Sequence, residues 1–133
     1  MEAVIAESTL ESLRCLALDA PGLELLVLFG SRARGDAHGA SDWDFGYLAT
    51  ESFDPAAFAA ALVGMLGTEK VDLVNLDRAS GLLRYRAARD GRTVVERRPG
   101  LADRFWLSAV DFWCDASPLL ERGYADVLAA LDR

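Results

Sequence analysis

Two carboxylates, Asp42 and Asp44, stand one residue apart inside an otherwise apolar and aromatic run, DWDFGYLA, over residues 42–49. In a β-strand, residues i and i+2 point to the same face, so the two side chains start about 6.6 Å apart at the backbone and can converge on one centre. Trp43 and Phe45 would pack on the other face. An isolated Asp-x-Asp pair more commonly faces solvent, so this pair needs further support before it indicates a site.

A third carboxylate supplies that support. Asp72 lies in the run KVDLVNL, residues 70–76, whose β-branched and apolar residues predict another strand. If the two strands are neighbours, three carboxylates meet, and they repel one another and are costly to desolvate unless a cation binds between them. Mg²⁺ is a hard cation that takes carboxylate and phosphate oxygens together, so the sequence predicts a Mg²⁺ site.

The dipeptide Gly30-Ser31 follows the apolar run LELLVLF, residues 23–29, which predicts a buried strand. If a helical turn begins there, free backbone N–H groups and the serine hydroxyl can bind phosphate oxygens, and Gly30 permits close approach of the backbone. Gly-Ser ends many strands, so the dipeptide alone is a weak signal. Beside an acidic metal cluster, it indicates a nucleotide site for phosphoryl or nucleotidyl transfer.

The order of these residues resembles a known signature. Gly30-Ser31, ten further residues, Asp42-x-Asp44 and a later strand aspartate, Asp72, are similar to the pattern of the DNA polymerase β-like nucleotidyltransferase superfamily. The small size, the segments FGSRARGDAHGASDWDFGYL and VDLVNL, and the tail WLSAVDFWCDASPLLERGY resemble the minimal nucleotidyltransferases that serve as antitoxins to HEPN-domain ribonuclease toxins. The resemblance covers most of the chain and is strongest from Leu25 to Leu76.

This resemblance implies an enzyme that transfers AMP from ATP to a tyrosine of its partner toxin, silences it and also binds it. The positions that carry over are Asp42, Asp44 and Asp72 for Mg²⁺, and Gly30, Ser31 and Arg34 for the phosphates of ATP. Asp72 would ligate the second metal or help to deprotonate the attacking hydroxyl. Two other functions stay open: nucleotide transfer to a small aminoglycoside-like molecule, and an antitoxin that masks the toxin by binding alone.

The composition restricts which folds and which kinds of partner are expected. The chain has 133 residues, 52% of them hydrophobic and 26% charged, which predicts one globular domain with a core over about 1–98 and a helical tail over about 99–133. The net charge of −7 argues against direct docking on nucleic acid. We also expect no secretory signal and no membrane span, because the longest uncharged run, residues 55–68, is short and contains glycines. A cytoplasmic protein is therefore expected.

The expected fold class is α/β (α+β): a small mixed β-sheet with helices packed on it, as in the polymerase β-like nucleotidyltransferase core, plus C-terminal helices. Ser8 and Glu11 predict a capping box for the first helix, and Asp54 with Pro55 predicts the start of another. The expected helices cover residues 9–19, 54–66, 79–89 and, in one or two pieces with Pro118 at the break or start, 101–131. The expected strands are 23–29, 42–49, 70–76 and a short edge strand, TVVE, at 93–96.

Structural roles are expected for most of the remaining candidate residues. Cys15 and Cys114 are expected to be buried free thiols, and His38 a loop residue without a zinc site. Arg32 is expected to be solvated or to lie along the surface. The basic segment is interpreted as a charged helix exterior, with an acidic partner or the nucleotide as the alternative; it contains Arg84, Arg86, Arg89, Arg92, Arg97 and Arg98. Core packing and partner binding are both open for the tail aromatics Phe105, Trp106, Phe112 and Trp113.

Overall fold

A computed structural model of the chain describes residues 5–34, 42–112 and 114. The four strands form one sheet in the order β3-β2-β1-β4. They are β1 (Leu23–Phe29), β2 (Trp43–Ala49), β3 (Val71–Asn75) and β4 (Arg92–Glu96). β1 runs antiparallel to both β2 and β4, whereas β2 and β3 run in parallel. The mixed sheet confirms the expected fold class, and β4 lies at one edge as expected.

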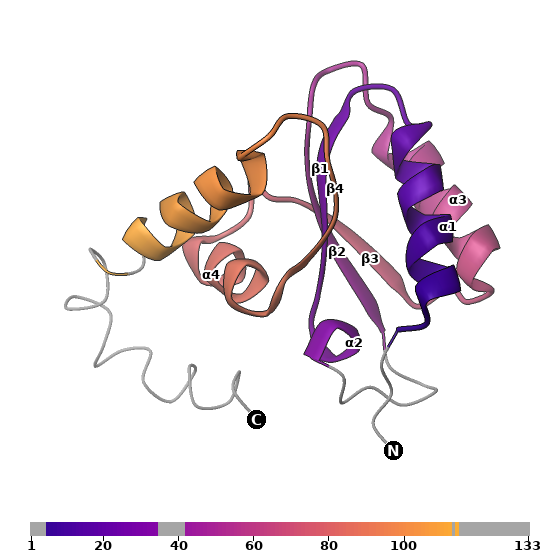
Figure 1. Ribbon diagram of the computed structural model, residues 1–133, viewed down its shortest axis with the longest axis horizontal. Coiled ribbons are helices and arrows are strands. Elements are labelled where there is room, and N and C mark those ends of the chain that lie inside the picture. Colours follow the sequence, from indigo (N-terminus) through magenta and orange to yellow (C-terminus); the bar gives the residue numbers. More distant parts are fainter. Residues whose placement is uncertain (1–4, 35–41, 113, 115–133) are drawn as a thin grey trace.

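Helices cover both faces of this sheet (Figure 1). The helices are α1 (Glu7–Leu18), α2 (Ser31–Arg34), α3 (Pro55–Leu66), α4 (Gly81–Asp90) and a helix over residues 101–112. α1 and α3 lie together on one face, and α4 and the 101–112 helix contribute to the core on the other face. The single turn α2 directly follows β1, where the Gly30-Ser31 dipeptide predicts a helical turn.

β1 is buried on both faces because its side chains alternate between the two cores. Leu26 and Leu28 pack in the cluster that α1 and α3 close, whereas Leu25, Val27 and Phe29 pack in the cluster that contains residues of α4 and the 101–112 helix. A continuous apolar strand is what such two-sided burial requires. The strand therefore holds the residue that follows it, Gly30, at a fixed place beside β2.

The helix α3 begins and ends where its sequence predicts. The Asp54 carboxylate accepts a hydrogen bond from the Ala57 backbone N–H at 3.1 Å, Pro55 occupies the first turn, and Gly67 ends the helix with a left-handed φ of 72°. The capping box expected at α1 is wrong. That helix begins at Glu7 with Ala6 as the N-cap residue, and no side chain caps it, because Ser8 already lies inside the first turn.

Both cysteines are free, as expected, but both are exposed, so the expectation of buried thiols is wrong. Cys15 lies two positions from each of the buried residues Leu13 and Ala17, which places its side chain on the opposite side of α1. His38, Trp113 and Pro118 lie outside the described residues. None of the helices in the described part of the chain combines the length and apolarity that a membrane crossing needs.

Gly46 of β2 has a packing role on the same face as Asp44. A Cβ atom built at this position would come within 2.7 Å of the side chain of Leu76, which is fully buried. The absence of a side chain at residue 46 therefore lets Leu76 close the sheet against its neighbouring core.

Arg84 does not behave as a solvated helix exterior. Its guanidinium donates hydrogen bonds to the Leu76 backbone carbonyl at 3.0 Å and to the Ser108 hydroxyl at 3.2 Å, and it lies 5.2 Å from the centre of the Phe105 ring. Arg84 thus ties α4 to the 101–112 helix. A helix that packs between a sheet and another helix has less free exterior than its sequence alone indicates.

Candidate functional site

Asp44 lies in the middle of the candidate site. In the register of the sheet it stands opposite Asp72 of β3 on one side and opposite Phe29 of β1 on the other. Neighbouring strands are about 4.8 Å apart, so the Asp44 and Asp72 side chains start from adjacent positions on one face. Trp43 and Phe45 pack in the core on the other face, as the alternation of the strand predicts.

Asp44 lies within electrostatic reach of the other two predicted carboxylates. Burial raises the pKa of the Asp44 carboxyl above its ordinary value, and the charges of Asp72 and Asp42 raise it further. The guanidinium groups of Arg86 and Arg34 oppose this and lower the pKa, but they do not cancel the rise. An ionised Asp44 is therefore held at a cost in free energy that a bound cation would offset.

Asp42 and Asp72 are more open to solvent than Asp44. Asp42 directly precedes β2, and both side chains are exposed. Among the described residues, no three carboxylate, histidine or cysteine side chains are gathered tightly enough to enclose a metal ion. The structure thus brings Asp44 and Asp72 into register and Asp42 within electrostatic reach, and the assignment of all three as metal ligands stays a prediction.

Gly30 lies directly against the Asp44 carboxylate. A Cβ atom at Gly30 would come within 2.4 Å of Asp44 Oδ2, and the backbone of Gly30 is left-handed with φ at 77°. Both facts require glycine here. Ser31 begins α2, and the Gly30 carbonyl accepts hydrogen bonds from the Ala33 and Arg34 backbone N–H groups, each at 3.1 Å. The predicted phosphate-binding dipeptide therefore lies beside the central carboxylate, although phosphate binding itself stays a prediction.

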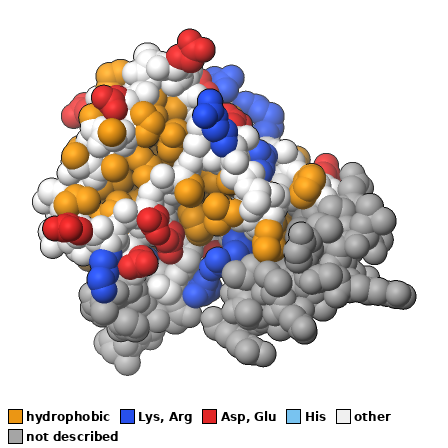
Figure 2. All heavy atoms as spheres, turned by 180° about the vertical axis from the view of Figure 1, so that it is seen from behind, with side chains coloured by type: hydrophobic (Ala, Val, Ile, Leu, Met, Phe, Trp, Pro, Cys, Tyr) orange, Lys and Arg blue, Asp and Glu red, His pale blue; other side chains and the backbone are white. Residues whose placement is uncertain are grey.

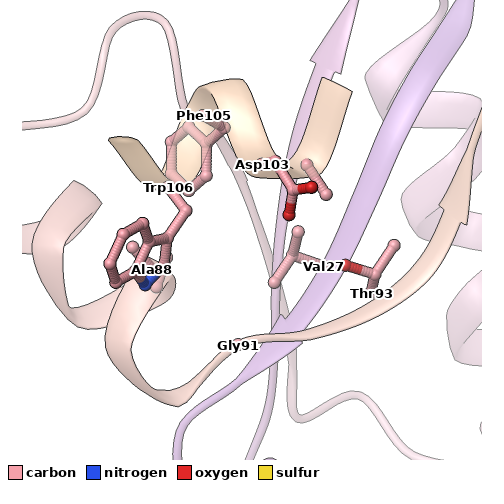
Figure 3. A pocket seen from close by; sticks show the side chains of 9 residues that line it. Val27, Ala88, Gly91, Thr93, Asp103, Phe105 and Trp106 are labelled. Carbon is pink, nitrogen blue, oxygen red and sulfur yellow. The ribbon is translucent and has the colours of Figure 1, made fainter. Parts of the chain in front are cut away.

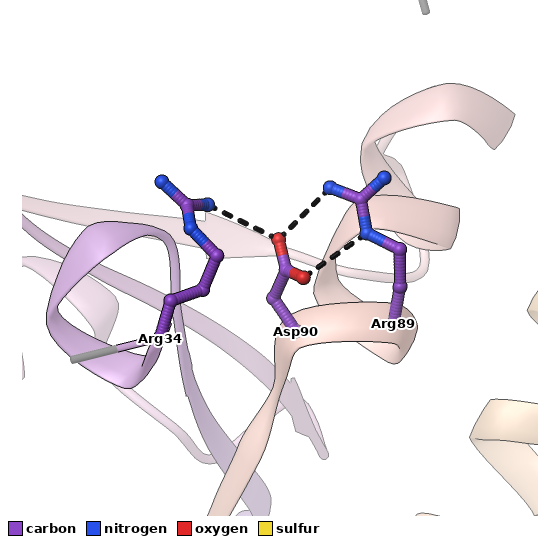
Figure 4. Close-up of polar contacts among 3 residues, drawn as sticks. All are labelled: Arg34, Arg89 and Asp90. Carbon is purple, nitrogen blue, oxygen red and sulfur yellow. Dashed lines mark hydrogen bonds and ion pairs between the residues drawn. The ribbon is translucent and has the colours of Figure 1, made fainter. Parts of the chain in front are cut away.

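Arg34, the third predicted nucleotide-binding residue, is held by α4. Its guanidinium donates a hydrogen bond to Asp90 Oδ2 at 3.2 Å, and Arg89 binds the same carboxylate from the other side (Figure 4). The Asp90 side chain is only 9% exposed. Burial alone would raise the pKa of Asp90, but the hydrogen bonds and charges of Arg89 and Arg34 outweigh it and lower the pKa below its ordinary value. Asp90 therefore fixes Arg34 near the site.

The lowered pKa of Asp90 predicts a pH-dependent contribution to stability. Since the folded protein holds the ionised form, the contribution is complete above the unfolded value of about 3.8 and is lost as the pH falls through the lower folded value. We expect Asp90→Asn to lower the free energy of unfolding by about 1 kcal/mol near neutral pH. The difference from the unchanged protein should shrink below about pH 4, which thermal unfolding measured across an acid series tests. A difference that stays constant with pH would contradict it.

Arg86 is a site residue that sequence reasoning did not single out from the basic segment. It projects from α4, its charge acts on Asp44, and its Nε is buried without a hydrogen-bond partner among the described residues. The sequence feature that could have pointed to Arg86 is its spacing of four residues from Asp90, which places both side chains on one face of α4. A buried guanidinium N–H with no acceptor beside an acidic cluster is suited to binding an anionic ligand.

Arg32 and the hollow shown in Figure 3 lie apart from this chemistry. The Arg32 guanidinium lies 4.3 Å from the centre of the Trp43 ring, which agrees with a packing role. The hollow has a volume of about 130 Å³ and lies between β1, β4, α4 and the 101–112 helix, with Val27, Thr93 and Trp106 in its lining. The predicted carboxylates are not part of that lining.

Comparison with known proteins identifies the family. The model of the family described as "Polymerase beta, Nucleotidyltransferase" matches residues 11–99, a segment that contains the sheet, Gly30 and all three carboxylates. The chain belongs to the polymerase beta nucleotidyltransferase family. The resemblance inferred from the spacing of Gly30-Ser31, Asp42, Asp44 and Asp72 is therefore confirmed at the level of the family.

Relatives of this nucleotidyltransferase include antitoxins. The protein adenylyltransferase MntA from Aphanizomenon flos-aquae (strain 2012/KM1/D3) is 39% identical over 114 residues, which cover 76% of this chain and 75% of that protein. A crystal structure of a toxin-antitoxin with AMP-PNP contains a chain that is 26% identical, with a TM-score of 0.74 and coverage of 90% of this chain and 98% of the matched one.

A further solved structure is similar in fold. It contains a tri-AMPylated Shewanella oneidensis HEPN toxin in complex with MNT antitoxin. The matched chain is 23% identical, the TM-score is 0.70, and the match covers 92% of this nucleotidyltransferase and 98% of that chain.

Proposed function

We propose that this nucleotidyltransferase is an antitoxin that transfers AMP from ATP to a tyrosine hydroxyl of a HEPN-domain ribonuclease toxin and so neutralises it. The observation that carries the proposal is the in-register pair Asp44 and Asp72 beside Gly30, inside a chain of this family. Similarity to a protein adenylyltransferase, and to a toxin-antitoxin crystallised with AMP-PNP, supports both the reaction and the nucleotide.

The donor set fits a hard divalent cation such as Mg²⁺. Asp42, Asp44 and Asp72 offer only carboxylate oxygens, and the pKa of Asp44 is raised by burial and then by the charges of Asp72 and Asp42, which the surrounding arginines leave incompletely balanced. When bound, the cation would neutralise charge on the triphosphate and lower the pKa of the attacking hydroxyl. Asp72, which is exposed, would ligate the second metal or receive the proton of that hydroxyl.

The remaining residues of the site would orient the nucleotide. Gly30 gives the triphosphate close access to the backbone beside Asp44, and Ser31 offers a hydroxyl at the start of α2. Arg34, held in place by Asp90, and Arg86 from α4 supply positive charge near Asp44. These contacts would direct the α-phosphate of ATP toward the tyrosine, with pyrophosphate as the leaving group.

Intact-mass spectrometry of the toxin tests this proposal. The purified chain is mixed with its cognate HEPN-domain toxin, ATP and Mg²⁺, and the toxin is weighed before and after. We expect the toxin to gain the mass of one or more AMP units and to lose ribonuclease activity. A stable complex without any gain in mass would instead favour masking by binding alone. AMP found on an added aminoglycoside, with the toxin unchanged, would favour the small-molecule reaction.

A further inference from the structure

The outer face of α3 lacks the polar side chains that a surface helix normally has. Its sequence, PAAFAAALVGML, contains no charged, hydroxyl or amide side chain. Only Phe58 and Leu62 are buried, whereas the exposed positions are Pro55, Ala56, Ala57, Ala60 and Gly64. Helices of this character are usually covered on all sides. The outer face of α3 is therefore suited to being covered by another protein.

Hollows beside this helix form a groove between α1 and α3. One hollow, of about 250 Å³, is lined by Leu16, Phe53 and Phe58 among others, and a second, of about 510 Å³, extends along α1 to Met65. The two share Leu16 and Asp19, so they are continuous. Figure 2 shows hydrophobic side chains gathered on this side of the molecule with carboxylates around them. We call the surface formed by these two hollows and the exposed positions of α3 the α1–α3 groove.

The charges around the α1–α3 groove are acidic. Asp19, Asp54 and Glu11 belong to its lining, which includes no lysine or arginine among the described residues. Glu7 is exposed at the start of α1, and Glu51 is exposed in the segment that precedes α3. The nearest arginine on α1, Arg14, pairs with Glu11 at 2.9 Å. An apolar strip with acidic margins is complementary to an apolar strip with basic margins.

We propose that the α1–α3 groove is a surface that holds the toxin at a place separate from Asp44, which lies on the other face of the sheet, through an apolar helix of the toxin flanked by lysine or arginine. The proposal rests on the proposed function for the identity of the partner. A ribonuclease must attract the phosphate backbone of RNA, so it carries the basic surface that these carboxylates complement. The alanines and Gly64 allow a partner helix to approach closely, because no bulky side chain stands between the two backbones.

A second copy of this chain fits the groove less well. A two-fold contact places the same patch of each copy against the other, so the carboxylates of one copy would face those of its partner. Such like-charge contacts oppose association. Charge complementarity therefore favours a different, basic protein over self-association.

Exposed apolar side chains on another helix supply the matched control. Trp106, Leu107 and Phe112 of the 101–112 helix are 47%, 53% and 51% exposed. These side chains are as apolar as the groove but belong to the helix that contributes to the opposite core. A glutamate introduced at Leu107 thus tests the same chemical change on a different surface.

The test is calorimetric titration of the full chain with its cognate HEPN-domain toxin. Ala60→Glu should weaken binding at least about 30-fold, because it places a charge on the exposed apolar face of α3 that the partner helix would cover. Asp19→Lys should weaken binding about 5-fold or more by reversing one charge at its margin. Leu107→Glu should leave the affinity within about 2-fold. Thermal unfolding of each variant checks that it is folded.

The outcomes separate this proposal from the proposed function. If the chain binds and AMPylates the toxin but Ala60→Glu binds as tightly as the unchanged protein, the groove is not the docking surface and the reaction stands. If Leu107→Glu alone loses binding, the 101–112 helix is the interface. If light scattering shows that the chain forms a dimer and that Ala60→Glu makes this dimer dissociate, the groove binds a second copy of the chain. If the unchanged chain neither binds nor AMPylates the toxin, both proposals fall.

Discussion

Replacing Asp42 and Asp44 together by alanine is expected to abolish AMP transfer while the toxin still binds. Asp44 is the central carboxylate, in register with Asp72, and its pKa is raised by burial and by the charges of Asp72 and Asp42. If the three carboxylates hold the cation as proposed, removing two of them leaves too few ligands to bind it. A bound cation supplies several kcal/mol of transition-state stabilisation, so the rate should fall about 10³-fold or more.

The matched control removes the same two charges elsewhere. Asp103 and Asp111 are exposed on the 101–112 helix, so Asp103→Ala with Asp111→Ala changes the net charge equally without touching the site. This control should transfer AMP at the normal rate. Full transfer by the Asp42/Asp44 variant would show that these carboxylates do not hold the cation. Loss of transfer with undiminished neutralisation of the toxin would support masking by binding alone.

The variant with Asp42→Ala and Asp44→Ala should be more stable than the unchanged protein when no divalent cation is present. A raised folded pKa means that ionisation of Asp44 costs stability, a cost that begins as the pH rises through the unfolded value of 3.8. Thermal unfolding in a chelator measures this effect. A rise in the melting temperature together with a loss of AMP transfer would show that the site retains its charges for function at the expense of folding.

Local signals in the sequence predicted most of the fold. The apolar run of residues 23–29 predicted β1 with its observed ends, and Asp54, Pro55 and Gly67 predicted α3, because caps and turn residues act within a few positions of themselves. The capping box at Ser8 failed because two starting points compete within one turn of α1. The exposure of the cysteines depends on which side of a helix meets the sheet, and a short apolar neighbourhood does not determine that.

The site was predictable only in part, for a similar reason. The spacing of Asp42, Asp44 and Asp72 identified the family, and the alternation of β2 placed Trp43 and Phe45 correctly on the far face. Arg86 and the hold of Asp90 on Arg34 depend on how α4 crosses the sheet. Such contacts join residues that are more than 40 positions apart in the chain. The four-residue spacing of Arg86 and Asp90 places both on one face of α4, but it does not reveal what that face meets.

Replacing Gly30 by alanine should inactivate the protein without removing any functional group. Two effects combine at this residue. A left-handed backbone with φ at 77° costs an L-residue about 1–2 kcal/mol, and the new Cβ atom would come within 2.4 Å of Asp44 Oδ2. Asp44 or the β1–α2 turn must then move by a large fraction of an ångström. Since misplacement of about 1 Å in an active site costs about 10²-fold in rate, we expect a loss of that order in AMP transfer.

Gly67→Ala separates the two effects. Gly67 has nearly the same left-handed backbone, with φ at 72°, but a Cβ atom there would meet nothing within 4 Å. Both variants should therefore lose about 1–2 kcal/mol of stability from backbone strain. Only Gly30→Ala should also lose AMP transfer, as measured by the mass of the toxin at equal protein concentration. Equal activity of the two variants would show that Asp44 need not keep its position, and hence that the contact between β1 and β2 does not set the geometry of the reaction.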